Sequence, residues 1–324
     1  MPEKRSIRDR LDSWCFIGTN VVGIREYSES DRTAATLSLV AFVAGISLIW
    51  AVIGPGHSAA SISEASGSQV IPSTTLAMFR TIAAMASVFT LSAIASNKEG
   101  LNYNVLDYET KIYGPRRLLG TSRLAAYTMW SFGLLGIYFS IAAFVTWSHI
   151  LGTNVPDILL VACPAALAAS CASALLVSAT VTFILIPESN ERGDNISHYF
   201  LWDNQIMHNG NVIILGAELL VTGITIGLSH ISFPVIFGAI YVTFSAFFAM
   251  REGGFYFYDF LDPRLNGAPV IHMILLAVLA ALYIGVILLT SLVDWNRGVA
   301  AVVIILLLHL VTTFKDPKEA TLDS

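Results

Sequence analysis

Long apolar runs alternate with shorter polar connections along most of the 324-residue chain. A helix needs about 20 consecutive apolar residues to cross the bilayer core, and eight runs approach this length. The short alternating strands of membrane barrels are absent from the pattern. The chain is therefore predicted to be all-α, a polytopic transmembrane bundle of about eight helices. We expect these helices at approximately residues 34–54, 73–96, 124–148, 157–186, 204–228, 231–249, 270–292 and 298–314.

The composition supports this class of protein. Apolar residues make up 55% of the chain, charged residues only 13%, and the mean hydropathy is +0.68. Soluble domains usually have about a quarter of their residues charged. We expect a polar N-terminal segment (1–33), a single transmembrane domain (34–314) and a polar C-terminal tail (315–324). Nothing in the pattern indicates a nucleic-acid partner.

Lysine and arginine gather in alternate connections. The N-terminal segment, the connections after the second, fourth and sixth predicted helices, and the tail together hold 16 of them, whereas the opposite connections hold only Arg297. Positive charge stays on the side that is not translocated. We therefore expect both termini on the inner side, which is the cytosol, matrix or stroma. The sequence leaves open whether the membrane is the endoplasmic reticulum, the plasma membrane or an organellar inner membrane.

Few ionisable residues fall within the predicted helices, and such residues are expensive in lipid and often functional. Arg80 and Glu218 lie at matching depths beyond the midplane. Because a buried charge in lipid usually seeks a partner, we interpret these two residues as a structural ion pair.

Thr128 and His208 lie at nearly the same depth, within about 10 Å of the inner boundary, given a rise of about 1.5 Å per residue. Asn211 follows three residues after His208, on the same face of an α-helix. A histidine near neutrality can take the proton of a threonine hydroxyl and activate it as a nucleophile, and Asn211 can donate to an oxyanion. Alternatively, His208 links helices and Thr128 bonds back to its own helix.

Two further residues are candidates for substrate contact. His272 begins the seventh predicted helix at the inner face, as a rival base or a substrate ligand. Tyr258 stands in the aromatic segment GGFYFYDFLDP, where aromatic residues usually anchor a helix at the interface, but its phenol can also donate to a substrate carboxylate. No metal or cofactor motif accompanies these residues.

Three blocks of the chain resemble the androgen-induced and androgen-dependent membrane hydrolases, together with the wider rolling-stone-like membrane proteins. They are YTMWSFGLLGIYF (Tyr127 to Phe139), MHNGNVIILGAE (Met207 to Glu218), and IFGAIYVTFSAFF followed by GFYFYDFLDP. The resemblance covers about residues 75–292, a six-helix core, with the first and last helices as additions. It implies a hydrolase of fatty-acid esters of hydroxy fatty acids that needs no cofactor, with Thr128 as nucleophile and His208 as base.

Two functions from different classes follow. The first is a membrane enzyme that cleaves an acyl-lipid ester. The second is a non-catalytic accessory subunit of a larger membrane complex, for example an organellar energy-converting complex, whose partners are other membrane subunits. The placement of Thr128 relative to His208 bears on the choice between them.

Overall fold

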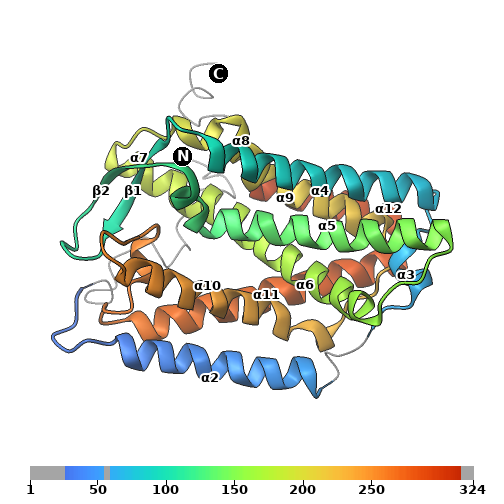
Figure 1. The fold of residues 1–324 in the computed structure, drawn as a ribbon, viewed down its shortest axis with the longest axis horizontal. Coiled ribbons are helices and arrows are strands. Elements are labelled where there is room, and N and C mark those ends of the chain that lie inside the picture. The colour runs from blue at the N-terminus through green and yellow to red at the C-terminus, as the bar shows by residue number, and fades with distance from the viewer. Residues whose placement is uncertain (1–25, 55–58, 315–324) are drawn as a thin grey trace, which may run out of the picture.

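Long helices run roughly parallel to one axis in the computed structural model, which describes residues 26–54 and 59–314 (Figure 1). Much of the predicted N-terminal segment and all of the tail at 315–324 lie outside the described residues. Six described helices are long and apolar enough to cross a membrane, so the chain is an integral multi-pass membrane protein. They are α2 (Thr33–Val52), α4 (Ser73–Ser96), α5 (Tyr127–Leu151), the continuous helix Asp157–Arg192, the segment Leu228–Met250 and α11 (Ala268–Trp295).

Two of the eight predicted spans differ from these six. The fifth forms a helix through α8 (Trp202–Gln205), the π turn η5 (Ile206–Gly210) and α9 (Asn211–Val221), and the chain then leaves the helix. Its first half is polar, so only the α9 part is apolar. The eighth, α12 (Arg297–Val311), has 15 residues. At 1.5 Å per residue it extends only about 22 Å, less than the roughly 30 Å of a bilayer core.

The fourth predicted span is longer than expected. It comprises α6 (Asp157–Thr180), the π turn η3 (Val181–Leu185) and α7 (Ile186–Arg192), which together form one helix of 36 residues. This corresponds to about 54 Å, so the helix is longer than a bilayer core is thick. Its last part, α7, lies at the end of the bundle where the charged connections gather.

A small antiparallel sheet corrects the prediction of an all-α fold; the chain is mostly helical. Within the connection after α4, β1 (Leu101–Asp107) pairs with β2 (Tyr113–Leu118), and β3 (Phe255–Tyr256) adds to the other edge of β1. Val105, Leu118 and Phe255, one from each strand, are buried together. Burial of this apolar face, together with the hydrogen bonds of the ladder, explains why the connection is ordered as strands.

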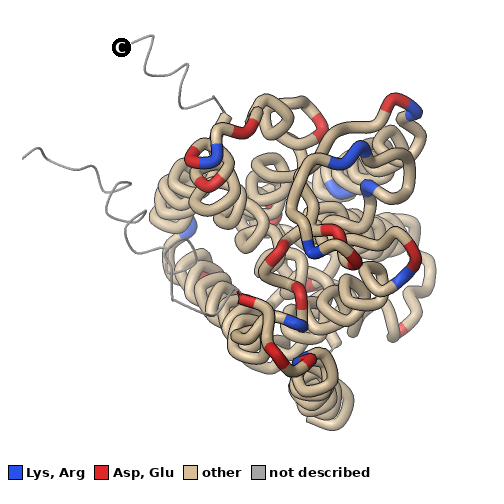
Figure 2. The backbone as a smooth tube through the Cα atoms, turned by 90° about the vertical axis from the view of Figure 1, so that its left-hand side faces the viewer, with Lys and Arg blue, Asp and Glu red and all other residues tan. Residues whose placement is uncertain are grey.

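The connections gather at two ends of the bundle. The sheet, α7 and α8 lie at one end, whereas α3 (Ile62–Ser66) and the start of α6 lie at the other (Figure 1). Figure 2 looks onto the sheet end, where charged residues follow one another in the connections. Of the described Lys and Arg residues, Arg297 lies at the opposite end and Arg80 within the bundle. The side of the membrane on which the sheet end lies stays a prediction.

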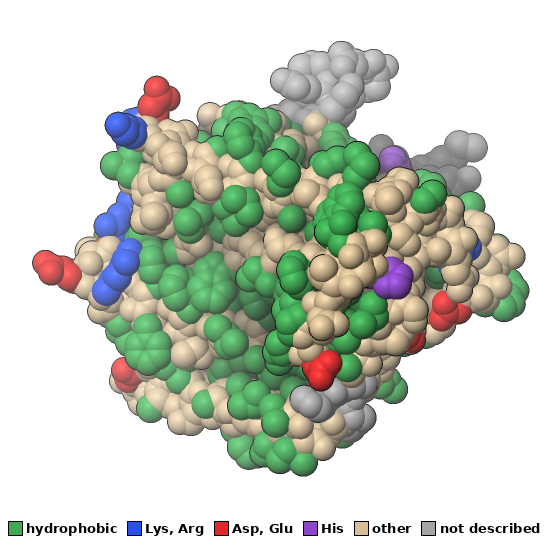
Figure 3. All heavy atoms as spheres, turned by 45° about the vertical axis from the view of Figure 1, so that its right-hand side comes forward, with side chains coloured by type: hydrophobic (Ala, Val, Ile, Leu, Met, Phe, Trp, Pro, Cys, Tyr) green, Lys and Arg blue, Asp and Glu red, His purple; other side chains and the backbone are tan. Residues whose placement is uncertain are grey.

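The flank of the bundle is mostly apolar, and most of the charged side chains in Figure 3 lie toward the left and right margins of the view. Large hydrophobic side chains point outward along it: Phe42 is 64% exposed, Phe89 68% and Leu288 66%. In water such a surface would be an aggregation liability. In a bilayer it is the surface that contacts the acyl chains.

Candidate functional site

A polar cavity of about 610 Å³ lies at the sheet end of the bundle. Its walls come from β1, the start of α5, the end of α7 and the segment that follows, η5, and the connection after β3. Thr128 and His208 both line it, and so does Tyr258. The structure therefore brings three of the predicted site residues to one cavity.

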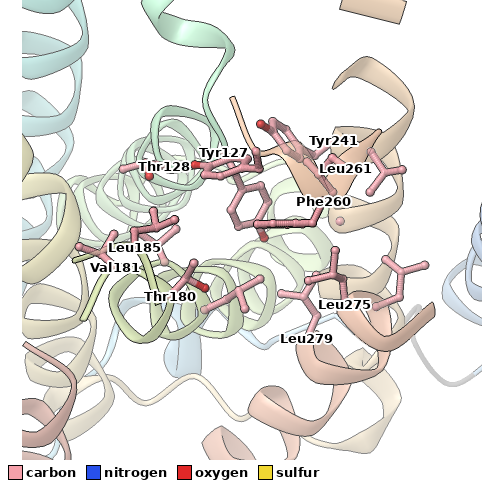
Figure 4. A pocket seen from close by; sticks show the side chains of 16 residues that line it. Tyr127, Thr128, Thr180, Val181, Leu185, Tyr241, Phe260, Leu261, Leu275 and Leu279 are labelled. Atoms are coloured by element: carbon pink, nitrogen blue, oxygen red, sulfur yellow. The ribbon is translucent and has the colours of Figure 1, made fainter. Parts of the chain in front are cut away.

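A smaller, apolar cavity of about 70 Å³ adjoins the polar one. Figure 4 shows Tyr127 and Thr128 of α5 on one side of it, and Leu275 and Leu279 of α11 on the other. α10 (Ser232–Met250) and the end of α6 contribute further apolar side chains. Three residues line both cavities: Thr128, Leu185 and Tyr258. The polar and the apolar cavity meet at the Thr128 hydroxyl group, and together they match the polar and apolar parts of an amphiphilic molecule.

Each of the two π turns places a residue in a wall of these cavities. Leu185 belongs to η3 and lines both cavities, and His208 belongs to η5 and lines the polar one. π turns are rare and are frequently found at functional sites, since they redirect side chains away from the regular α-helical face. Two of them at one pair of cavities mark this region as a specialised part of the bundle.

Thr128 is the second residue of α5, which is separated by Ala126 alone from the 3₁₀ turn η2 (Gly120–Ala125). The side chain is buried, with 7% of the residue exposed. Burial raises the pKa of the Tyr258 phenol above its ordinary value, and hydrogen bonding to Thr128 opposes this rise. The phenol therefore stays protonated at neutral pH and lies within reach of the Thr128 hydroxyl.

The backbone and the ring of His208 contact two neighbouring segments. Its carbonyl oxygen accepts a hydrogen bond from the Ser178 hydroxyl of α6, and its ring centroid lies 6.2 Å from that of Tyr199. The residue is 6% exposed, and Nδ1 is buried without a hydrogen-bond partner among the described residues. Within the same part of the chain, no hydrogen bond joins His208 to Thr128; both face the cavity instead.

Asn211 does not share the cavity with His208, contrary to the sequence-based expectation. The expectation assumed α-helical spacing, but the hydrogen bonds of a π turn span five residues, so each residue advances the helix by a smaller angle. Asn211 lies against α6, where its Oδ1 is 3.3 Å from the Ser178 hydroxyl, and it is not among the residues that line the polar cavity. This position does not fit the expected oxyanion donor.

His272 also lies apart from both cavities. It is 1% exposed, its Nδ1 donates to the carbonyl oxygen of Ala268 one turn earlier at 2.7 Å, and it is absent from the cavity walls. A carbonyl is only an acceptor, so Nδ1 carries the proton. His272 therefore packs within α11 and its surroundings and does not fit the expected roles of rival base or substrate ligand.

Arg80 of α4 and Glu218 of α9 lie in direct contact, as the matched depths suggest. Both are 0% exposed, and Nη2 of Arg80 lies 2.6 Å from Oε1 of Glu218, with Nε at 3.1 Å from the same oxygen. The Tyr138 hydroxyl donates to that oxygen at 2.6 Å. The guanidinium also donates to Thr146 Oγ1 at 2.7 Å and to Thr222 Oγ1 at 2.9 Å. This is a packed, hydrogen-bonded charge cluster.

The same cluster explains the break after α9. Arg80 Nη1 also donates at 2.5 Å to the carbonyl oxygen of Ala65 in α3, which folds back against the bundle. The non-helical backbone after Thr222 stays hydrogen-bonded, since Gly223 N donates to Gly67 O at 3.0 Å. A Cβ on Gly223 would stand 2.9 Å from the Glu64 carbonyl oxygen, so only glycine permits this approach. Irregular backbone at membrane depth requires this kind of internal satisfaction.

Several residues of the polar cavity were not predicted from the sequence. Asn104, Asp194, His198 and Tyr199 all line it. Asn104 Nδ2 donates to Asp194 Oδ2 at 2.9 Å, which joins β1 to the segment after α7. The signal was present in the polar run from Asp194 to His198, which directly precedes the His208 helix, but its relation to β1 depends on the sheet.

No group of three or more His, Cys, Asp or Glu residues is placed to hold a metal ion within residues 26–54 and 59–314. Comparison of the chain with known protein families, with curated proteins and with solved structures finds no match. The geometry of the two cavities is therefore the basis on which a function can be assigned.

Proposed function

We propose that the chain is a membrane-embedded hydrolase of acyl-lipid esters, with Thr128 as the nucleophile and His208 as the general base. The observation that carries this proposal is that Thr128 stands where the polar and apolar cavities meet, with His208 in the wall of the polar one. An ester that lies across this junction has its acyl chain on the apolar side and its alcohol on the polar side.

In the proposed reaction, the Thr128 hydroxyl oxygen attacks the ester carbonyl carbon, and His208 accepts the hydroxyl proton. The tetrahedral intermediate collapses, the alkoxide takes that proton from His208, and the acyl group remains on Thr128. Water from the polar cavity then attacks the acyl group while His208 accepts a proton from it. The fatty acid leaves, and the proton returns to the Thr128 oxygen.

Tyr258 replaces Asn211 as the proposed oxyanion donor. Its phenol reaches Thr128 and lines both cavities. A neutral phenol next to the attacked carbonyl can donate a hydrogen bond to the oxyanion of the tetrahedral intermediate. The missing contact between Thr128 and His208 is compatible with this scheme, because catalytic hydrogen bonds often tighten only when substrate is bound.

The second candidate is a non-catalytic accessory subunit of a membrane complex. One observation favours it: the described contacts include no hydrogen bond from His208 to Thr128. If the gap stays open when a lipid binds, the two residues only shape the cavity. An activity-based experiment separates the two functions.

The experiment uses the full-length protein in detergent and an alkyl fluorophosphonate probe, which reacts with activated hydroxyl nucleophiles. We expect labelling of the wild type and its loss in Thr128→Ala. Thr243→Ala is the matched control, since the Thr243 hydroxyl bonds back to the Ala239 carbonyl at 2.8 Å and lines neither cavity, and it should be labelled like the wild type. Labelling that survives Thr128→Ala overturns the mechanism, and a wild type that resists the probe and cleaves no acyl ester favours the accessory subunit.

A further inference from the structure

We infer that the polar cavity binds an uncharged, hydroxyl-bearing headgroup, so that its ligand is an acylated polyol such as a monoacylglycerol. The inference deepens the proposed function by naming the alcohol part of the ester. It rests on the juxtaposition of asparagine, tyrosine and histidine side chains around the cavity, and on the distribution of charge in its walls.

The cavity walls contain no lysine or arginine among the described residues. Carboxylate and phosphate groups are typically held by arginine or lysine, which match their charge and geometry. The lining instead includes four asparagines (Asn102, Asn104, Asn195 and Asn204) and four tyrosines (Tyr103, Tyr113, Tyr199 and Tyr258). These side chains offer neutral donors and acceptors, which suit hydroxyl groups rather than anions.

The tyrosines remain donors at neutral pH. Burial raises the pKa of the Tyr113 phenol to about 12 and raises the pKa of Tyr103 above its ordinary value. The phenols are therefore uncharged and can exchange hydrogen bonds with hydroxyl groups in either direction.

The one carboxylate in the lining, Asp194, is already engaged. It accepts hydrogen bonds from Asn104 Nδ2 at 2.9 Å and from Arg192 Nε at 3.0 Å. The Arg192 guanidinium also lies over the Tyr113 ring, 5.2 Å from its centroid. The groups that could attract a cationic headgroup, the Asp194 carboxylate and the Tyr113 ring, are therefore already in contact with the Arg192 guanidinium. This argues against a quaternary ammonium ligand, although aromatic rings are present.

His198 provides an acceptor of defined type. Its Nδ1 lies 3.1 Å from the carbonyl oxygen of Asn195, and because a carbonyl only accepts, Nδ1 carries the proton. Burial lowers the pKa of the imidazole below its ordinary 6.5, so the ring is neutral at pH 7. In a neutral ring with a protonated Nδ1, Nε2 is an acceptor, which suits a ligand hydroxyl and repels a carboxylate.

The experiment measures binding without hydrolysis. Full-length protein in detergent is labelled with a photoreactive hexadecylglycerol ether, and unlabelled competitors of the same chain length are added: hexadecylglycerol ether, hexadecanoate, hexadecylglycerol phosphate and hexadecylphosphocholine. We expect the glycerol ether to compete at about tenfold lower concentration than the others, which corresponds to the loss of one to two hydrogen bonds. Equal or better competition by either anion or by the phosphocholine overturns the inference.

Two variants test the named contacts. His198→Phe and Asn104→Leu should each weaken binding of the glycerol ether about five- to tenfold. Competition by hexadecanoate should stay unchanged. His149→Phe, an exposed histidine at the other end of α5, is the control and should bind like the wild type. If both cavity variants bind the glycerol ether like the wild type, the inference is wrong.

The outcomes separate this inference from the proposed function, because the ether cannot be hydrolysed. Selective binding of the glycerol ether without any ester turnover refutes the hydrolase and supports the headgroup assignment. Turnover of acyl esters without preference for the glycerol ether refutes the headgroup assignment and leaves the hydrolase intact.

Discussion

The Arg80 cluster and the cavity around Thr128 both place polar groups inside an apolar bundle, but they differ in how those groups are satisfied. Arg80 and Glu218 are fully buried and in direct contact, and the hydrogen bonds of the cluster converge on Glu218 Oε1, whereas Oε2 has no partner among the described residues. Thr128 and His208 face a volume of about 610 Å³, and His208 Nδ1 has no partner among the described residues. A packed ion pair of this kind fixes the arrangement of helices. Groups that face open space are available to a ligand.

The largest expected effect follows from breaking the buried ion pair. Arg80→Met removes the cation and leaves Glu218 buried without its counter-charge, which typically costs about 3–5 kcal/mol. We expect a correspondingly lower free energy of unfolding, measured by equilibrium unfolding in mixed detergent. The double variant Arg80→Met with Glu218→Leu should recover much of the loss, since it removes both charges. A single variant as stable as the wild type would show that this cluster does not stabilise the fold.

The next effect falls on the cavity and should leave stability nearly unchanged. His208→Gln keeps a polar side chain of similar size but removes the base, and general-base catalysis contributes about 10²- to 10⁴-fold. We expect ester turnover to fall within that range, measured with a monoacylglycerol, while the melting temperature stays close to that of the wild type. A large drop in melting temperature with unchanged turnover of the folded protein would assign His208 to the structural class of Arg80.

Tyr258→Phe tests the proposed oxyanion donor. The loss of one such donor typically lowers turnover by about 10²-fold or more, and we expect a fall of roughly this size. Tyr127→Phe is the matched control, because the Tyr127 hydroxyl donates to Ser173 Oγ at 3.0 Å and lies outside the polar cavity. Equal effects of the two substitutions would contradict the assignment.

The smallest expected effect concerns pH. The pKa of His198 is lowered in the folded protein by burial, so the unfolded chain binds the proton more readily. Stability from this residue is therefore complete above the unfolded pKa of about 6.5 and decreases as pH falls below it. We expect the melting temperature to drop less between pH 7.5 and pH 5.5 in His198→Gln than in the wild type. The same drop in both proteins would contradict a half-buried, neutral His198.

The spans that the sequence predicts well are those whose apolar character is uniform. α2, α4 and α11 begin and end within a few residues of their predicted bounds, because hydropathy and helix length describe a lipid-facing helix almost completely. The pairing of Arg80 with Glu218 could also be predicted from the sequence. A buried charge needs a partner, and the depth of each residue follows from its position along a predicted span.

The cavity was only partly accessible. Thr128 and His208 could be placed at one depth, but the π turn that removes Asn211 from their face is a local change in hydrogen bonding that residue spacing does not reveal. The wall formed by Asn104 and Asp194 depends on a strand pairing that reaches from β1 to β3, about 150 residues later in the chain. Long-range pairings of this kind leave little trace in a local pattern.

The short helix α12 has a consequence for the surrounding lipid. It extends only about 22 Å, and its outward side chains are apolar, with Val302 58%, Ile305 62% and Leu306 63% exposed. The neighbouring α11, with 28 residues, is about twice as long. A bilayer that covers both must thin beside α12 or leave part of α11 uncovered, at a cost that grows with each ångström of mismatch. The bilayer is therefore expected to thin locally beside α12, and the distribution of the protein between vesicles of short-chain and long-chain phospholipids would report the cost of that mismatch.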